Sequence, residues 1–170
     1  MREPAGSRPA ASSRLLGWWR RCEGLPFGRA IFTLVLRFAV PYSASIGPQV
    51  LVLSPGHAKI ALRDHGGVRN HLGSIHAVAL TNLGELASGL AMTAVMPAGV
   101  RGIVRSITTE YTKKARGTLV AESRVTLPPV AADTDFEVLA EIRDAGGETV
   151  ARVRVLWRLG LVPDRTARAS

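Results

Sequence analysis

Residues able to cleave an activated acyl group are concentrated in one short stretch of the sequence. Asn70, His76 and Glu85 supply an amide, an imidazole and a carboxyl group, and Ala77 follows the histidine. A carboxylate activates water or attacks as a nucleophile, and an imidazole transfers protons or orients a neighbour. A backbone N–H at a helix N-terminus stabilises a developing oxyanion. These groups are therefore the candidate catalytic residues.

A helix within 69–92 is expected to position these groups. Apolar residues recur at helical spacing and share one face, which predicts a buried amphipathic helix: Ile75, Ala79, Leu83, Leu86 and Leu90. Much of the remaining surface is small, which lets a sheet pack closely around the helix: Ala77, Gly84, Ala87, Gly89 and Ala91. Ser74 is the expected N-cap, and would leave the N–H groups of residues 75–77 free to bind an oxyanion.

Glu85 lies on the polar edge of this helix, between Thr81 and Ser88. At 1.5 Å per residue, it is about 12 Å along the axis from Ala77. Glu85 is therefore too far away to act on a carbonyl group held at the N-terminus of its own helix. If both groups take part in one reaction, they come from two subunits.

The motif Asn70-His71-x-Gly73-Ser74-Ile75-His76-Ala77, followed by Leu83-Gly84-Glu85, resembles hotdog-fold thioesterases of the phenylacetate-pathway type, in an uncharacterised branch. The resemblance spans about 41–160. It implies an α+β fold in which an antiparallel sheet wraps around one long central helix. It also implies hydrolysis of acyl-CoA thioesters in a homodimer or a dimer of dimers.

The resemblance also assigns roles to the residues of the motif. Asn70 and Glu85 would position and activate water, and the N–H after His76 would polarise the thioester carbonyl. The His-Gly-Gly of the family is His76-Ala77-Val78 here, which leaves the exact oxyanion donor open. A literal His65-Gly66-Gly67 precedes the helix, and its glycines predict a turn.

Other readings of the histidines remain open. His76 either takes part directly or is a packed residue that orients the helix start. His57 and His71 have no partner at a telling spacing, and each is expected at the surface or in a loop. No metal is expected, because His71 and His76 are five residues apart and lack the i, i+4 spacing of a zinc helix.

A basic run, Lys113, Lys114 and Arg116, lies between two expected strands. The resemblance makes these residues candidates for binding the phosphates of coenzyme A near a dimer interface. Ordinary solvated turn residues are the alternative. No separate cofactor is expected, because coenzyme A enters as part of the substrate.

The chain divides into four segments by composition. We expect a disordered arm over 1–13, a helical extension over 14–41, the hotdog domain over 42–160 and a polar tail over 161–170. Alternating apolar residues and turn signals predict six strands, over 49–53, 57–63, 102–112, 117–125, 135–143 and 149–159. The apolar run 30–40 is too short to span a membrane.

The helical extension is rich in aromatic residues, and three roles are open for it. Trp18, Trp19, Phe27, Phe32 and Phe38 either pack over an edge of the domain or form a lid over an acyl-binding tunnel. In the third reading, Trp18-Trp19-Arg20-Arg21 rests at a membrane surface.

Charge and cysteine content limit the partners and the compartment. The chain has 22 basic and 13 acidic residues, and seven of the basic and two of the acidic residues lie in 1–38. This balance favours anionic partners, but no nucleic-acid-binding motif accompanies it and none is expected. Cys22 is the only cysteine, so no intrachain disulfide is possible and a reducing, cytoplasmic location is expected.

Two alternatives to hydrolysis remain open on the same fold. The protein could bind acyl-CoA without turnover, as a structural or binding module. It could also be a hydratase or dehydratase, for which His76 would be the catalytic histidine and Glu85 its acidic partner. Fold does not decide between these reactions.

Overall fold

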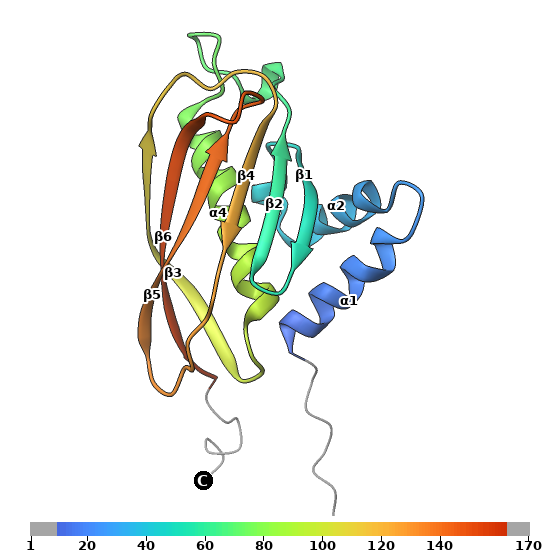
Figure 1. The fold of residues 1–170 in the computed structure, drawn as a ribbon, viewed down its shortest axis with the longest axis vertical. Coiled ribbons are helices and arrows are strands. Elements are labelled where there is room, and N and C mark those ends of the chain that lie inside the picture. Colours follow the sequence, from blue (N-terminus) through green and yellow to red (C-terminus); the bar gives the residue numbers. More distant parts are fainter. Residues whose placement is uncertain (1–9, 163–170) are drawn as a thin grey trace, which may run out of the picture.

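A computed structural model describes residues 10–162 of the chain. Six strands form one fully antiparallel sheet in the order β1-β2-β4-β5-β6-β3, which curves around a long helix (Figure 1). The strands are β1 Pro48–Ser54, β2 His57–Leu62, β3 Val100–Tyr111, β4 Leu119–Arg124, β5 Thr134–Arg143 and β6 Thr149–Leu161. The helix is α4, Ala77–Val95. This arrangement confirms the predicted α+β hotdog fold.

Helix α4 forms the centre of the core because most of its surface is apolar or small. The predicted stripe is buried along its whole length, and Leu83, Ala87 and Ala91 are fully inaccessible. A Cβ atom placed on Gly84 would lie 2.3 Å from Cγ2 of Val153, so β6 approaches the helix at contact distance there. By length and composition α4 could span a membrane, yet 67% of that window is buried within the fold. Its packing is that of a core helix.

The long strand β6 shows the expected division between core and solvent. Val153 and Val155 are fully buried, whereas Arg154 and Arg158 face outward and form ion pairs with acidic residues of neighbouring strands. The alternation of apolar and charged residues thus places one face on α4 and the other in water.

The N-terminal segment contains α1 (Ala11–Glu23), α2 (Gly28–Ala39) and the single turn α3 (Pro41–Ala44), which pack beside β1 and α4 (Figure 1). The rings of Trp19 and Phe32 pack edge to face, with centroids 5.0 Å apart. Both side chains are buried, which confirms packing for this pair. The packing prediction is wrong for Phe27 and Phe38, which are 85% and 83% exposed, whereas Trp18 is about half-buried, at 51% exposed.

Segment boundaries differ from the expected ones at both ends. Helix α1 begins at Ala11, so the last three residues of the expected arm are helical, and β6 continues to Leu161 at the start of the expected tail. The rest of the expected arm, 1–9, and of the tail, 163–170, lie outside the described residues. The turn expected at His65-Gly66-Gly67 is present as the short 3-10 helix η1, Gly66–Val68.

Strand β3 is one edge of the sheet and bonds only to β6 among the described strands. Most of its side chains are exposed, including Ile103 (58%), Ile107 (40%) and Tyr111 (47%). A 12-residue edge strand with apolar side chains offers an unpaired row of N–H and C=O groups to another strand.

Candidate active site

The N-terminus of α4 is capped by His76 rather than by Ser74, which corrects the expected helix start. The imidazole Nδ1 of His76 accepts a hydrogen bond from the Val78 N–H at 3.1 Å. A neutral imidazole that accepts at Nδ1 carries its proton on Nε2. In this state His76 can donate a hydrogen bond, but it has no ring nitrogen left to act as a base.

The expected set of three free N–H groups is reduced to one. Ile75 N–H donates to the carbonyl of Ala115 at 2.9 Å, and His76 N–H donates to that of Val68 at 2.8 Å. These bonds form because the chain before α4 runs as a short extended segment between two loops. The N–H of Ala77 makes no hydrogen bond within residues 10–162. Ala77 is therefore the oxyanion donor that the geometry supports.

The first residues of α4 are held in place from strand β3. The Tyr111 hydroxyl donates to the carbonyl of Ala77 at 3.1 Å, and Thr81 and Thr109 share a hydrogen bond of 2.9 Å between their hydroxyl groups. The Ala77 carbonyl and the Thr81 side chain are thus held by contacts outside the helix itself.

Asn70 shapes the loop that leads into the helix. Its side-chain oxygen accepts from the N–H groups of Leu72 and Ser74, at 2.9 and 3.2 Å, and from the Ser74 hydroxyl at 3.2 Å. The side-chain oxygen is therefore occupied, which leaves the amide NH₂ for a substrate or water. A catalytic role for Asn70 stays a prediction.

Glu85 lies in a hollow between α3, α4 and the edge strand β3. The cavity measures about 430 Å³, and its wall is mostly apolar or hydroxylic: Tyr42, Ser43, Val78, Thr81, Asn82, Glu85, Val104 and Ile107. Val104 and Ile107 place the edge strand β3 in the wall of this hollow.

Burial raises the pKa of the Glu85 carboxyl above its ordinary value, and the nearby Ser43 hydroxyl partly opposes this effect. None of the ion pairs among the described residues includes Glu85. A partly desolvated carboxylate without a counter-ion is more basic than a solvated one, which suits a general base.

Two residues near Glu85 were missed by the sequence analysis. Asn82 is one helical turn before Glu85 and is only 9% exposed, although it lines the same hollow. A polar residue between Leu80 and Leu83 was the signal that could have revealed it. The second residue is Trp157, which lies close to Glu85 beside Gly89. A Cβ atom placed on Gly89 would be 3.9 Å from the Trp157 ring and 3.7 Å from Oε1 of Glu85. The Trp157 indole N–H is buried and has no partner among the described residues.

The three residues of the basic run differ in whether an acidic side chain compensates their charge. Lys113 forms ion pairs with Asp144, at 2.7 Å, and with Glu148, both in the neighbouring hairpin. These two carboxylates raise the pKa of Lys113 and compensate its charge. Lys114 and Arg116 are exposed and make no ion pair within residues 10–162. Only these two charges are free to meet a phosphate.

The fold thus gathers the candidate residues into two groups. Asn70 lies in the loop that leads into α4 and His76 and Ala77 at the start of that helix, whereas Glu85 lies further along the helix in its hollow. Among the described residues, no three His, Cys, Asp or Glu side chains converge in a way that could hold a metal ion.

Comparison with known proteins places this chain among others of the same fold. The profile of the family described as "Domain of unknown function (DUF4442)" matches residues 28–159. The structural-genomics protein APC5556 is 30% identical, with a TM-score of 0.76 and coverage of 90% of this chain and 100% of its own. No curated protein gives a significant match to the sequence.

Two more distant structures share the fold and are named as thioesterases. A probable thioesterase of unknown function from Pseudomonas aeruginosa is 22% identical, with a TM-score of 0.69 over 81% of this chain and 97% of its own. A thioesterase from Haemophilus influenzae is 11% identical, with a TM-score of 0.65 over 77% and 91%. At this identity the likeness establishes the hotdog fold, while the phenylacetate-pathway type stays a prediction.

Proposed function

The chain belongs to the DUF4442 family, and we propose that it hydrolyses acyl-CoA thioesters at a site shared by two subunits. One observation carries the proposal: an N–H at Ala77 without a partner among the described residues and a partly buried carboxyl group at Glu85 lie on the same core helix. The fold is one that proteins named thioesterases also have.

In the proposed reaction, the thioester carbonyl oxygen accepts a hydrogen bond from the Ala77 N–H of one subunit. The positive end of the α4 dipole adds to the stabilisation of the oxyanion. His76, which caps the helix through Nδ1, has an Nε2–H that can donate to the same region. The amide NH₂ of Asn70 is left for water or substrate.

Glu85 of the other subunit takes a proton from water as the water oxygen attacks the carbonyl carbon. The tetrahedral intermediate then expels the coenzyme A thiolate as the C–S bond breaks, and the acid is released. A thiolate needs little protonation to leave, so no general acid is required. A direct attack by Glu85, which forms a mixed anhydride that water then hydrolyses, is the alternative route.

A homodimer would bring the two groups together, either alone or as a dimer of dimers. The long edge strand β3 lines the hollow that contains Glu85, and its side chains Ile103 and Ile107 are exposed. Pairing of β3 with its copy would satisfy the edge hydrogen bonds and cover these apolar side chains.

A proline at position 77 tests the oxyanion donor without disturbing the helix. Proline is favoured at the first helical position, and His76 before it has φ −64° and ψ 140°, which a following proline accepts. Ala77→Pro removes one N–H, so we expect kcat to fall by about 10²- to 10³-fold, the usual loss for an oxyanion donor. An unchanged circular dichroism spectrum and melting temperature are the control, and near-normal turnover would contradict the assignment.

The free basic residues give a second test, directed at coenzyme A. Lys114→Ala with Arg116→Ala should raise the Michaelis constant for acyl-CoA with little change in kcat, and the wild-type constant should rise with salt. Lys113→Ala is the matched control, since the charge of Lys113 is already compensated by Asp144 and Glu148. Phosphate binding by Lys114 and Arg116 would be contradicted if Lys113→Ala raised the Michaelis constant as much as the double variant does. It would also be contradicted if salt left the wild-type constant unchanged.

Three measurements distinguish hydrolysis from the two other functions. Thiol release from short, long and aryl acyl-CoA esters identifies a thioesterase and its substrate class. Thermal stabilisation by an ester without turnover would favour a binding or structural module. Addition of water across an enoyl-CoA would favour a hydratase. The cytoplasmic location stays a prediction.

A further inference from the structure

The helical extension carries an apolar face that the rest of the described chain does not cover. Ile31, Leu34 and Phe38 lie along one side of α2 at spacings of three and four residues and are 43%, 53% and 83% exposed, and Phe27, directly before the helix, is 85% exposed. The opposite side of the same helix packs into the core through Phe32 and Leu36. Helix α2 is therefore apolar on two faces, of which the fold uses one.

Phe27 shows that the fold gains little from this face. Its backbone is in the left-handed region, with φ 61°, which is unfavourable for a bulky aromatic residue. The side chain is nevertheless 85% exposed, so no packing within the described chain offsets that conformation. An aromatic residue held outward at the tip of the α1–α2 turn is placed to contact something else.

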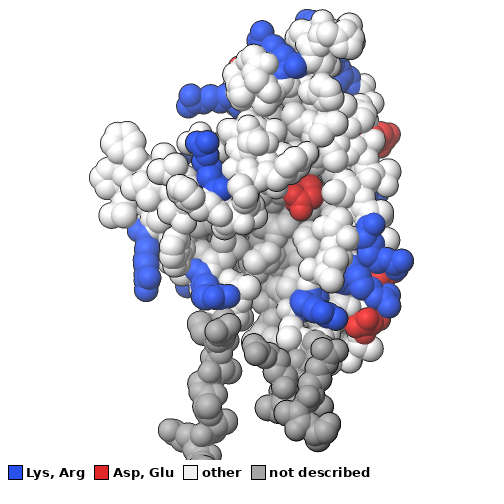
Figure 2. Space-filling model, turned by 180° about the vertical axis from the view of Figure 1, so that it is seen from behind, with Lys and Arg blue, Asp and Glu red and all other residues white. Residues whose placement is uncertain are grey.

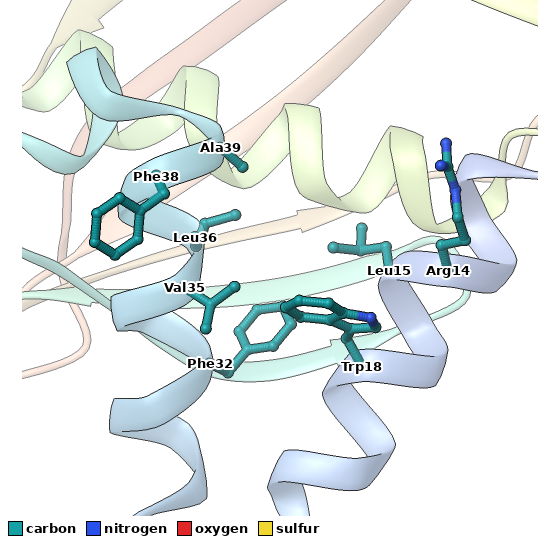
Figure 3. Close-up of a pocket in the computed structure, with 8 residues that line it drawn as sticks. All are labelled: Arg14, Leu15, Trp18, Phe32, Val35, Leu36, Phe38 and Ala39. Atoms are coloured by element: carbon teal, nitrogen blue, oxygen red, sulfur yellow. The ribbon is translucent and has the colours of Figure 1, made fainter.

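An apolar groove lies beside this stripe, between α1 and α2. Leu15 and Trp18 of α1 face Phe32 and Val35 of α2 across the groove, and Arg14 stands at one end (Figure 3). The groove measures about 560 Å³. Together, the groove and the stripe form one apolar surface, which we call the α2 surface.

The charge around the α2 surface is strongly basic. Between Ala10 and Ala44, five exposed arginines accompany a single acidic residue, Glu23: Arg14, Arg20, Arg21, Arg29 and Arg37. None of the five arginines takes part in an ion pair within residues 10–162. In Figure 2, where the extension projects to the left, basic side chains border an uncharged surface.

We propose that the α2 surface docks the protein on an anionic phospholipid membrane. Aromatic and aliphatic side chains would enter the interface, while the arginines contact lipid phosphates. The charge selects this occupant: a second copy of the chain would bring the same arginines face to face. The assay below needs no thioester turnover, so it can fail or succeed independently of the proposed hydrolysis.

The test is co-flotation of the full chain with vesicles of phosphatidylcholine alone, or of equal parts phosphatidylcholine and phosphatidylglycerol. Wild type should float with the anionic vesicles and lose this binding as salt is raised. Arg20→Glu with Arg21→Glu should weaken the partition coefficient by at least about 30-fold, roughly fivefold per arginine lost. Phe27→Asn with Phe38→Ser should weaken it by at least about tenfold. Asparagine tolerates the left-handed backbone, so this variant should still fold.

Matched substitutions elsewhere on the surface complete the test. Leu72→Ser with Leu139→Ser removes two apolar side chains that are 58% and 41% exposed, and Arg101→Glu with Arg124→Glu makes the same charge change. Both controls should bind as wild type does. Absence of wild-type binding, or an equal loss in the controls, would overturn the proposal. The proposal would also be overturned if the Phe27/Phe38 variant bound vesicles as wild type does but sedimented as a smaller assembly than wild type. That result would mean that a second copy of the chain covers the surface.

Discussion

Replacement of Glu85 by glutamine is expected to lower acyl-CoA turnover by about 10²- to 10⁴-fold, because the amide cannot accept the proton of the attacking water. The substitution keeps the size and shape of the side chain in the hollow with Ser43 and Asn82. Thiol release by wild type and Glu85→Gln, compared on the same ester, measures the effect. Turnover of the variant within threefold of wild type, on the order of ordinary surface changes, would remove Glu85 from the mechanism.

The same variant should be more stable than wild type at neutral pH. Burial raises the pKa of Glu85 in the folded state above its unfolded value, so the ionised carboxylate destabilises the fold. This penalty is absent below the unfolded pKa, where both states are protonated, and is complete above the folded pKa. The difference in melting temperature should therefore favour Glu85→Gln at neutral pH and shrink on acidification. A pH-independent difference would argue that Glu85 is solvated.

Mixing two inactive variants tests whether the site is shared. If Ala77 and Glu85 act from different subunits, exchange of Ala77→Pro with Glu85→Gln creates heterodimers with one intact site. Statistical exchange in a symmetric dimer should then restore about a quarter of wild-type activity. A site within one subunit would give no recovery, because neither chain carries both groups. The homodimers of each variant, measured separately, are the controls.

Substitution of Gly84 is expected to have the largest effect on stability. An added Cβ would lie 2.3 Å from Cγ2 and 2.5 Å from Cβ of Val153, well inside contact distance. Gly84→Ala should lower the free energy of unfolding by about 1–3 kcal/mol despite the better helix propensity of alanine. Gly84→Leu should not fold, because β6 cannot retreat without leaving β3 and β5. Chemical denaturation measures both variants.

Gly89, on the same helix, provides the matched control. The atoms nearest to a Cβ at Gly89 lie 3.7–3.9 Å away, which is ordinary contact. Gly89→Ala should therefore be neutral or stabilising by up to about 1 kcal/mol. Val153→Ala combined with Gly84→Ala should lose less stability than the two single changes together, by about 0.5–3 kcal/mol. Additive losses would show that Val153 is not the residue that Gly84 accommodates.

Much of the fold could be predicted from local patterns. The spacing of Ile75, Leu83 and Leu90 indicated a buried helix, and the alternation along 149–159 indicated a half-buried strand, because each pattern reflects one repeating geometry. All six strands appear within two residues of their expected limits. Burial of a stripe or a face is imposed by the hydrophobic effect, so these features depend little on the partner element.

The predicted N-cap of α4, Ser74, was wrong because the start of this helix depends on tertiary contacts. Ser74 is a good N-cap residue by type. However, the N–H groups of the next two residues donate to the carbonyls of Ala115 and Val68, which no local sequence pattern links to this segment. The helix can start only where those bonds end, at His76. Local propensity is worth about 1 kcal/mol at such a position, and the two backbone bonds to Val68 and Ala115 override it.

The sequence by itself determined the fold class, the central helix and the residue types of the candidate site. Only the tertiary structure decided which N–H remains free, that Lys113 is neutralised by Asp144, and that Phe27 and Phe38 face outward while Phe32 is buried. The physical reason is the same in each case. Hydrogen-bond satisfaction, charge compensation and exposure are properties of neighbours brought together by folding, and the sequence of one segment does not contain them.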